Sequence, residues 1–478
     1  MATRPKRPVA EATSSRGAAA PVNLTGSILR VLAENGTYDP STSYLIIDND
    51  DVDQVVGTFS ALTTNFAFLT PSVVYDAGTG NDVVLTLALA EALSFCSVAE
   101  TRNQCNVALA LDQLPPDNPL FQAILGQTAE GARQAFNALS GEIHATIPGV
   151  LADDSRYVRE AVLGRLMQAT YTNNASQVAS LGASGPQVAS LDAQALALGY
   201  DDKSLAPPAA GPGLAFWTRA YGAWGDFDGN NNAASAERDL GGFISGMDAR
   251  IGGTWRAGLG AGYSQSDISV SDRHSGADVE SFHLAGYAGG RAGPLALRGG
   301  GAWTWNDIDT SRAVIFPGFF EREKASYDAD TGQLFGEVAY PIAMDRTALE
   351  PFAGLAFVSI DTDSFKENGA LAALTSRGFD QNVGYSILGL RAAATMHVSN
   401  MVVTPHASAA WQHAFDDITP GAALAFASTG IGFDVTGVPL AEDSALIEAG
   451  LDFNLSPTAT LGASYSGQFG DGVEDNAV

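Results

Sequence analysis

The second half of the chain consists of long two-faced segments joined by connections of two very different lengths. Between residues 446 and 470 every second residue is apolar, as at Ile447, Leu451 and Phe453, and the residues between them are small or polar. Successive side chains of a strand point to opposite faces, so this stretch predicts a hairpin with one apolar and one polar face. The same pattern begins at about residue 213. A fold for this chain must therefore cover an apolar face that extends over many strands.

The connections between these strands discriminate between two ways of covering that face. About eleven strands are expected, at 215–226, 239–251, 254–269, 280–292, 295–309, 325–342, 347–361, 380–397, 401–415, 444–455 and 458–469. Short turns such as 252–253 and 293–294 alternate with long connections at 227–238, 270–279, 310–324, 362–379 and 416–443. Outer-membrane barrels have short periplasmic turns and long outer loops, whereas a soluble sandwich has no reason for strict alternation. The pattern therefore favours a mainly β fold, a transmembrane antiparallel β-barrel.

Aromatic residues on the apolar parity suit the two edges of a bilayer. Trp255 and Tyr263 share one predicted strand, and their separation is roughly 26 Å along the strand, or about 20 Å along the membrane normal at a tilt of about 40°. The predicted girdle residues are Trp255, Tyr263, Trp303, Trp305, Trp411, Tyr465 and Phe469. The alternative is that they are core aromatics of a soluble sheet.

Composition supports the barrel and excludes one class of partner. We find no run of about 18 apolar residues, which a transmembrane helix would need. A membrane protein without such helices must close its sheet, because lipid offers no hydrogen-bond partner to an open edge. The net charge of −28 argues against nucleic-acid binding, which requires a basic patch.

The strand count predicts an incomplete barrel. Antiparallel closure requires an even number of strands, and the first and the last of the predicted strands rise from the same side. One more strand must descend, and the final residues "VEDNAV" would be only its beginning. The sequence therefore predicts that the closing strand is missing.

The first half of the chain divides into segments of different pattern. Residues 1–25 are expected to be disordered or a wrongly assigned start, since they lack the apolar core of a secretion signal. Short β segments at 26–91 suit the last turns of a β-solenoid or a small capping sheet. Residues 92–170 have helical periodicity, and 171–212, rich in Ala, Ser, Gln, Gly and Pro, read as a flexible linker. The barrel takes 213–478.

The last helical segment, 153–169, is charged, with Asp153 or Asp154 as a possible N-cap. If the barrel begins on the short-turn side, a segment before it must cross the lumen, and a wet lumen can hold a charged helix. The helix residues are Asp153, Asp154, Arg156, Arg159, Glu160 and Arg165. The lumen-facing residues predicted to pair with them or line the channel are Asp248, Arg250, Arg256, Arg298, Glu337, Glu448 and Asp452. The alternative is a helix docked outside the barrel.

Other chemistry is weakly indicated. Cys96 and Cys105 could form a local disulfide in an oxidising compartment or remain two free thiols. Their spacing matches no metal signature, and the sequence contains no catalytic or nucleotide-binding motif of the kinds GxSxG, HExxH or GxxxxGK[ST]. We expect no enzymatic activity, no cofactor and no metal.

Several segments resemble, in order, parts of the autotransporters of type V secretion. "TSYLIIDND" and "NDVVLTLAL" resemble the end of a pertactin-like passenger β-helix, and "SVAETRNQCNVALALDQL", "LSGEIHATIPGVLADDSRYVREAVLGRL" and "FWTRAYGAWG" resemble the junction and the barrel entry. The resemblance implies an outer-membrane translocator of about twelve strands, with a linker helix in its pore and an N-terminal passenger exported to the cell surface. Its implied partners are outer-membrane lipid, the β-barrel assembly machinery and its own passenger.

This sequence departs from the family pattern in three ways: it shows no signal peptide, only a stub of passenger, and no closing strand with a terminal aromatic residue. Two alternatives to the translocator remain at this point. One is a surface-exposed adhesin or structural outer-membrane protein, and the other is a diffusion porin.

Overall fold

The computed structural model describes residues 22–33, 38, 43–49, 53–78, 81–90, 94–171, 214–344, 347–398, 401–456 and 459–478. Most of the predicted N-terminal segment 1–25 and nearly all of the predicted linker 171–212 lie outside these residues.

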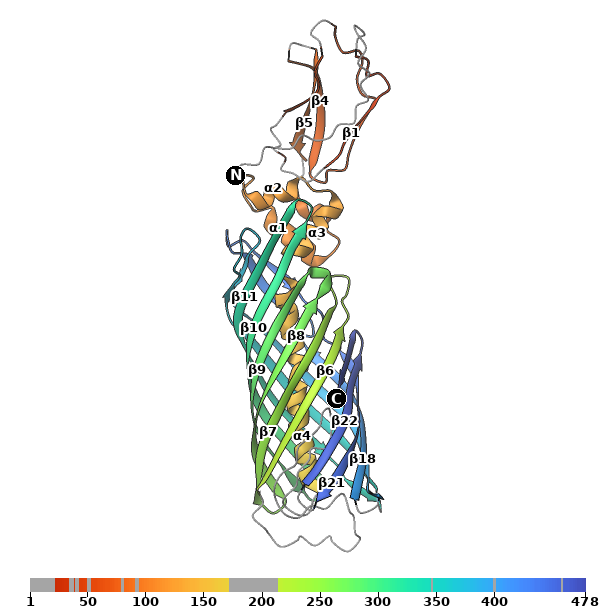
Figure 1. Ribbon diagram of the computed structural model, residues 1–478, viewed down its shortest axis with the longest axis vertical. Coiled ribbons are helices and arrows are strands. Elements are labelled where there is room, and N and C mark those ends of the chain that lie inside the picture. Colours follow the sequence, from red (N-terminus) through yellow and green to blue (C-terminus); the bar gives the residue numbers. More distant parts are fainter. Residues whose placement is uncertain are drawn as a thin grey trace.

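Twelve antiparallel strands form a closed barrel in sequence order, which confirms the predicted fold class (Figure 1). They are β6 (Ala215–Phe227), β7 (Ala236–Gly252), β8 (Trp255–Val270), β9 (Ser275–Ala292), β10 (Leu295–Phe316), β11 (Phe319–Ala339), β13 (Thr347–Thr362), β16 (Phe379–Ala394), β18 (Met401–Asp416), β21 (Asp443–Ser456), β22 (Ala459–Gly470) and β23 (Val473–Ala477). Short strands β12 (Ile342–Met344) and β17 (Met396–Val398) pair with β13 and β18 near the short-turn end. Gly252 and Gly253, both with positive φ, form the turn between β7 and β8.

The closing strand is present, so the prediction that it is missing is wrong. β23 pairs with β22 on one side and with β6 on the other, and Asp475 lies between Gln468 and Gly225. Val473, Asp475 and Ala477 all face the interior and are buried. A five-residue strand with a carboxylate on its inner face does not look like a membrane strand in the sequence.

Two of the predicted long loops are also wrong. β10 and β11 continue as one hairpin that turns at Pro317 and Gly318, and the loop predicted at 310–324 does not exist. The connection predicted at 270–279 shrinks to the short 3-10 helix η2 (Ser271–Arg273) and one further residue before β9. The hairpin extends because its inner side chains, including Val314 and Phe316, are buried in the same apolar cluster as helix α3 (Ala129–Leu139). Short and long connections therefore do not alternate strictly.

The two remaining long connections on the later half of the barrel are folded. Residues within 362–379 and 416–443 form a four-stranded sheet of β14 (Phe365–Lys366), β15 (Leu374–Ser376), β19 (Gly421–Phe426) and β20 (Gly432–Thr436). Asn106 donates to the Asp434 carbonyl at 2.8 Å. The sheet therefore lies at the same end of the barrel as the short helices.

Three short α-helices stand at that end, between the barrel and the N-terminal strands (Figure 1), and a 3-10 turn precedes them in the sequence. They are η1 (Phe95–Val98), α1 (Arg102–Leu111), α2 (Pro119–Leu125) and α3. Each α-helix starts at a side-chain cap, from Thr101, Asn118 and Thr128 respectively, because the first amides of a helix have no partner within it.

The N-terminal strands form two small sheets. β1 (Ile28–Val31) and β3 (Ala61–Thr64) pair in parallel, as successive turns of a solenoid do. β2 (Ser43–Ile47), β5 (Asp82–Leu89) and β4 (Leu69–Ala77) form an antiparallel sheet in that order. The described part of residues 26–91 thus contains both a parallel pair and a capping-type sheet.

Helix α4 (Glu142–Tyr171) runs down the inside of the barrel (Figure 1). It begins well before the predicted residue 153, so neither Asp153 nor Asp154 is its N-cap. Gly141, at φ +63°, makes the left-handed turn that separates α4 from α3, and the helix continues through Pro148. At 1.5 Å per residue it is about 45 Å long, as long as a bilayer with its headgroups is thick. No helix in the described ranges is both long and apolar enough to span a membrane.

Candidate functional site: the helix-filled barrel lumen

The lower end of α4 is anchored to the wall by a buried carboxylate on β7. Arg165 binds Asp248 with two hydrogen bonds, from Nε at 2.6 Å and from Nη2 at 3.0 Å. Arg256 of β8 donates to the same carboxylate. All three side chains are buried, and a bidentate arginine–carboxylate pair fixes both distance and orientation. The structure therefore brings together three of the predicted residues beside the short turn of β7 and β8.

The middle of α4 is bound to the closing strand. Asp475 accepts hydrogen bonds from Arg156 at 2.8 Å, from Tyr157 at 2.9 Å and from Arg238 of β7 at 2.6 Å. Asp154 forms an ion pair with Arg238 at 3.0 Å. Two helix residues predicted from the sequence thus meet partners that were not predicted.

Three further predicted helix residues have different surroundings. Asp153 accepts from Gln468 of β22 at 3.1 Å. Arg159 donates to Gln333 of β11 at 3.3 Å, and its guanidinium lies 5.6 Å from the ring centre of Tyr385. Glu160 is half-buried and lies 3.9 Å from Arg156.

A compact network of buried charges lies on the barrel wall formed by β10, β11, β13 and β16. Arg298 of β10 donates to Glu337 of β11 at 2.6 Å and to Glu350 of β13 at 2.8 and 2.9 Å. Arg391 of β16 donates to the same two carboxylates, at 2.9 and 3.2 Å to their Oε1 atoms. Two cations and two anions therefore balance one another across four adjacent strands, which keeps the buried charges compensated.

The remaining predicted lumen residues lie apart from these clusters. Arg250 is half-buried close to the short turn. Glu448 accepts from Ser408 at 3.4 Å, and Asp452 is buried 3.6 Å from His406. Glu448 and Asp452 lie on the inner face of β21 and their partners on that of β18, on the side of the lumen that α4 fills less completely.

A cavity remains between α4 and that side of the wall. Its volume is about 100 Å³, room for several waters. The residues that line it include Arg159, Glu160, Met167, Arg219 and Glu448. The lumen is thus mostly occupied by the helix, with a small space beside it that both charged and apolar side chains line.

The upper end of the lumen is closed by a second buried network. His144 in the first turns of α4 contacts Tyr327 of β11 at 3.0 Å and Glu367 at 2.9 Å. Arg312 of β10 donates to both oxygens of Glu367 at 2.7 Å and to the Ala138 carbonyl at 3.0 Å. Helix, wall and the β14–β15 connection are tied together at this point.

We expect the buried network around Glu367, at the upper end of the lumen, to lose stability in acid. Burial by itself would raise the pKa of this carboxyl, but the Arg312 guanidinium and the contact with His144 hold the pKa at about 2. Because the pKa is depressed from 4.5, the ionised Glu367 carboxylate stabilises the folded state by about 3 kcal/mol. This stabilisation is complete above pH 4.5 and is lost as the pH falls toward 2. Amide hydrogen exchange of α3 and the first turns of α4, followed across this range, measures the loss. Glu367→Gln should flatten the profile between pH 4.5 and 2, and an unchanged profile would contradict the assignment.

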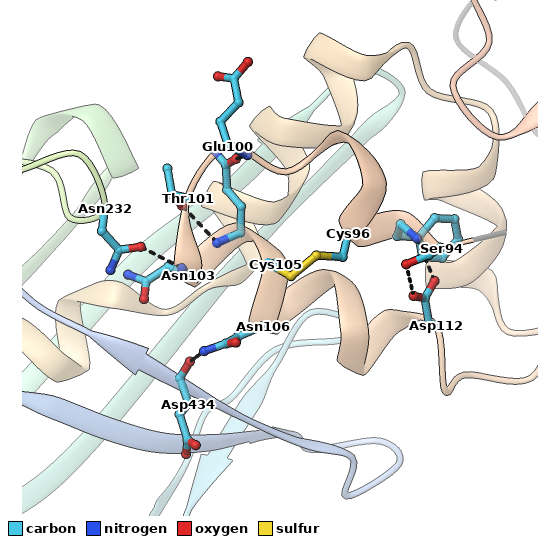
Figure 2. The surroundings of a disulfide bond; sticks show 12 residues. Ser94, Cys96, Glu100, Thr101, Asn103, Cys105, Asn106, Asp112, Asn232 and Asp434 are labelled. Atoms are coloured by element: carbon cyan, nitrogen blue, oxygen red, sulfur yellow. Dashed lines mark hydrogen bonds between the residues drawn. A yellow bond between two sulfur atoms is a disulfide. The ribbon is translucent and has the colours of Figure 1, made fainter. Parts of the chain in front are cut away.

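A disulfide secures the junction between the N-terminal strands and the helices (Figure 2). Cys96 of η1 and Cys105 of α1 are bonded, with a Cα–Cα distance of 4.6 Å. On one side of the bond Asp112 accepts from Ser94 and from the Phe95 amide. On the other side the Asn103 amide donates to Asn232 in the β6–β7 connection at 2.7 Å. The bond therefore reinforces the segment that rests on the barrel mouth.

Replacing both cysteines by alanine is expected to make local opening of α1 easier by about 2–3 kcal/mol, the loop-closure entropy of a loop this short. Hydrogen exchange of the α1 amides, compared with that of the β9 amides in the same sample, measures the change. Equal exchange in the two proteins would show that the helix is held by its packing alone.

The predicted girdle aromatics lie on the outer face of the barrel. Phe243, Tyr263, Phe282 and Trp305 face one another in register on four consecutive strands, and the rings of Tyr263 and Phe282 are 5.1 Å apart. Trp255 lies at the other edge, beside the short turn.

The other girdle candidates lie on the same outer face, away from the edge that Trp255 marks. The indole N–H of Trp303 donates to Asp330 at 3.3 Å and that of Trp411 to Asp443 at 2.9 Å. Tyr465 and Phe469 are half-exposed on β22. An aromatic ring with a wet polar end is what the boundary between lipid and water favours.

About half of the residues that form hydrogen bonds and ion pairs in the lumen were not predicted from the sequence. Glu350 and Arg391 lie on the inward parity of their strands, and Arg238 lies just outside the predicted start of its strand. Tyr157 was overlooked because it is not charged, and Asp475 lies in the tail that was taken for the start of a missing strand. Parity alone could have found the first two.

Comparison with known proteins identifies the barrel. Residues 216–466, more than half of the chain, match the family model for the autotransporter beta-domain. The chain belongs to the autotransporter family. Its barrel is the outer-membrane translocator of a type V autotransporter.

The curated relatives are longer than this autotransporter chain. An extracellular serine protease of Serratia marcescens is 30% identical over 471 residues, which cover 89% of this chain and 41% of that protein. Outer membrane protein A of Rickettsia conorii is 25% identical over 281 residues, 52% of this chain and 14% of that protein. The chain thus spans less than half the length of these relatives.

Solved translocator domains are also similar. That of the autotransporter NalP from Neisseria meningitidis is 16% identical, with a TM-score of 0.46, over 56% of this chain and 86% of that one. The beta domain of the Bordetella autotransporter BrkA is 19% identical, with a TM-score of 0.40, over 55% of this chain and 96% of that one.

Proposed function

We propose that this chain exports the passenger segment that precedes α4 in the same polypeptide to the cell surface, and that α4 is the part of the linker left in the pore. The observation that carries the proposal is the anchoring of α4 at both ends of the lumen. Arg165 binds Asp248 near the short turns, and His144 binds Glu367 at the opposite end. A chain fixed in this way has its N-terminal side on the long-loop face.

The lumen could give the passenger a path across the membrane, but we find no group in the sequence that would supply energy for its passage. The described clusters are ion pairs and hydrogen bonds between the helix and the wall, and the sequence has no phosphate-binding loop of the Walker type. We propose that folding outside the cell biases the passage. The junction supports this idea, because α1–α3, the disulfide and the four-stranded sheet on the mouth bury a shared apolar core that includes Phe95, Phe136 and Phe426.

The outer face supports two proposed partners. Exposed large apolar residues such as Leu259, Leu334 and Leu355 would contact outer-membrane lipid between the girdles. The C-terminal hairpin of β22 and β23 is where we expect the β-barrel assembly machinery to engage the chain.

The catalytic activity of a full-length protein would belong to its passenger, since the translocator fold is not catalytic. The Serratia relatives are extracellular serine proteases by name, which makes a protease passenger the first activity to assay. The porin alternative is disfavoured because α4 occupies most of the lumen, and the cavities found between it and the wall have volumes of about 100 and 30 Å³.

The experiment expresses the chain behind a secretion signal in a Gram-negative cell, with an epitope tag fused before residue 1. Protease added to intact cells is expected to remove the tag while the barrel stays in the outer membrane. The matched control carries the tag between Gly252 and Gly253, in a short turn, where it should be protected until the cells are lysed. A terminal tag that is reached only after lysis would refute export, and equal cleavage of both tags would refute the topology.

A further inference from the structure

Glu323, on the inner face of β11, is a fully buried carboxyl whose oxygens accept no hydrogen bond from the residues that the structure describes. It lies outside the membrane, because it is roughly 23 Å along the strand beyond Asp330, and Asp330 is the partner of the girdle residue Trp305. A carboxylate removed from water is normally paired or hydrogen-bonded, since its desolvation is costly. The contacts of the lumen described above give Glu323 no such partner.

The guanidinium opposite Glu323 is bound to other groups. Arg312 of β10 faces Glu323 directly in the register of the hairpin. Its donors bind both oxygens of Glu367 and the carbonyls of Ala138 and Ala372. Arg312 therefore offers Glu323 its charge but no hydrogen bond, and Glu367 already balances that charge.

A second carboxyl, that of Glu321, lies beside Glu323. The two carboxyls are within hydrogen-bonding reach of each other, and Glu321 also accepts from the Ala372 amide at 2.8 Å. Two ionised carboxylates cannot form a hydrogen bond, whereas a protonated carboxyl can donate to its neighbour. Like charges this close also favour the uptake of one proton by the pair. The geometry thus fits two carboxyls that carry a single negative charge between them.

The pair lies where the β14–β15 connection crosses β11. Lys324 and Asn368 donate to each other's carbonyls, at 3.1 and 2.6 Å. The next residue, Gly369, approaches the Glu323 carboxyl so closely that any side chain at 369 would overlap it. The same connection carries Glu367, which binds the first turns of α4. The charge of Glu323 therefore acts directly on the contact between the β10–β11 hairpin and the connection that holds the start of the helix.

We propose that Glu323 and Glu321 share a proton and form a pH-sensitive latch: the protonated pair holds the β14–β15 connection against the β10–β11 hairpin, and its ionisation loosens that contact. The charged groups that face the pair from the elements around it are Arg312 of β10, Glu367 after β14 and, beyond Glu367, His144 of α4. The latch concerns the mouth of the barrel and does not depend on the direction of export. Its consequence is that the junction before α4 is held more firmly in a mildly acidic medium than in an alkaline one.

The direction of the pH effect follows from the ionisation of Glu323. Burial raises the pKa of its carboxyl to about 7, against the opposing charge of Arg312 and with the added effect of the Glu367 and Glu321 charges. Because this pKa is higher than the ordinary value of 4.5, stabilisation by the proton is complete below pH 4.5 and is lost as the pH rises through 7. This range lies above the one in which the ionised Glu367 acts, and the two effects have opposite signs.

Hydrogen exchange of the Lys324 and Asn368 amides measures the latch, since these two amides bond across it. Rates in the folded protein, with a metal chelator present, are divided by the intrinsic exchange rate at each pH and compared with those of β9 amides in the same sample. Protection of the two amides should fall about tenfold or more between about pH 5 and pH 8, while that of the β9 amides stays level. In Glu323→Gln, which places a neutral group of the same size there, protection at pH 8 should remain at the level that the unchanged protein has at pH 5.

Two further variants complete the test. Glu321→Gln should also reduce the slope, because it removes one charge and supplies an N–H donor to Glu323, and it keeps the test decisive if Glu323→Gln does not fold. Glu280→Gln, on the exposed outer face of β9, is the matched control and should keep the full slope. The proposal is overturned if the unchanged protein shows no slope, or if both variants of the pair keep it. Recovery of the pH 5 protection at pH 8 on addition of calcium would also overturn it, since a cation rather than a proton would then lie between the carboxyls.

Discussion

Replacing Asp248 by asparagine is expected to destabilise the folded barrel by about 3–5 kcal/mol, the usual cost of removing one partner from a buried ion pair. Arg165 and Arg256 both depend on this carboxylate, so the change leaves two buried cations without their shared anion. Urea unfolding in detergent, followed by the mobility of folded and unfolded forms on a gel, gives the loss. The helix should also leave its site first, because Arg165 is its lowest anchor.

The matched control is Asp267→Asn, the same substitution on the outer face of β8. Asp267 is exposed and lies opposite Asp239 and Asp278 in register. Removing one charge from a row of like charges should be neutral or slightly stabilising. Equal effects at positions 248 and 267 would mean that α4 is not anchored where the structure places it.

Replacing Leu259 by arginine is expected to cost about 2–4 kcal/mol when the barrel folds into lipid vesicles, because the charge then lies near the middle of the bilayer. Leu259 is 63% exposed and lies between Met247 and Gly286 on the outer face. On the surface of a soluble sheet the same change would be worth only about 0.5 kcal/mol. The size of the effect therefore decides what touches this face.

Ser269→Arg provides the control, since Ser269 has the same strand and the same face but lies beyond the aromatic row, beside Glu237. It should fold into vesicles as well as the unchanged protein does. Similar costs at 259 and 269 would argue that depth in the membrane is irrelevant and that the apolar face has another cover.

The parts of the fold that period-two alternation controls were predictable. Lipid outside and a polar lumen inside act on every strand, so parity placed Trp303 outward and Arg298 inward without any knowledge of neighbours. The pairing of β23 was not predictable from parity. β23 is stabilised by Arg156, Tyr157 and Arg238, which are distant in the sequence, and nothing local marks "VEDNAV" as a strand that pairs on both sides.

The mouth of the barrel was mispredicted for a related reason. Loops that look polar and irregular acquire structure when a partner covers them, as β20 does when α1 binds it through Asn103 and Asn106. The start of α4 was misplaced at 153 although the predicted helical periodicity continued across Gly141 and Pro148, residues that normally interrupt a helix. Here the glycine does separate two helices, but the proline is absorbed inside a helix that is buried on nearly all sides.

The most direct test of the account is the accessibility of residue 159 in the folded barrel. Arg159→Cys introduces the one free thiol of a chain whose two native cysteines are bonded, at a side chain that is 4% exposed and faces the lumen. With Ser269→Cys as the exposed reference, a bulky maleimide should modify position 269 rapidly and leave position 159 unmodified until the barrel is denatured. Modification of position 159 at the rate of position 269 in the intact barrel would contradict a lumen filled by α4.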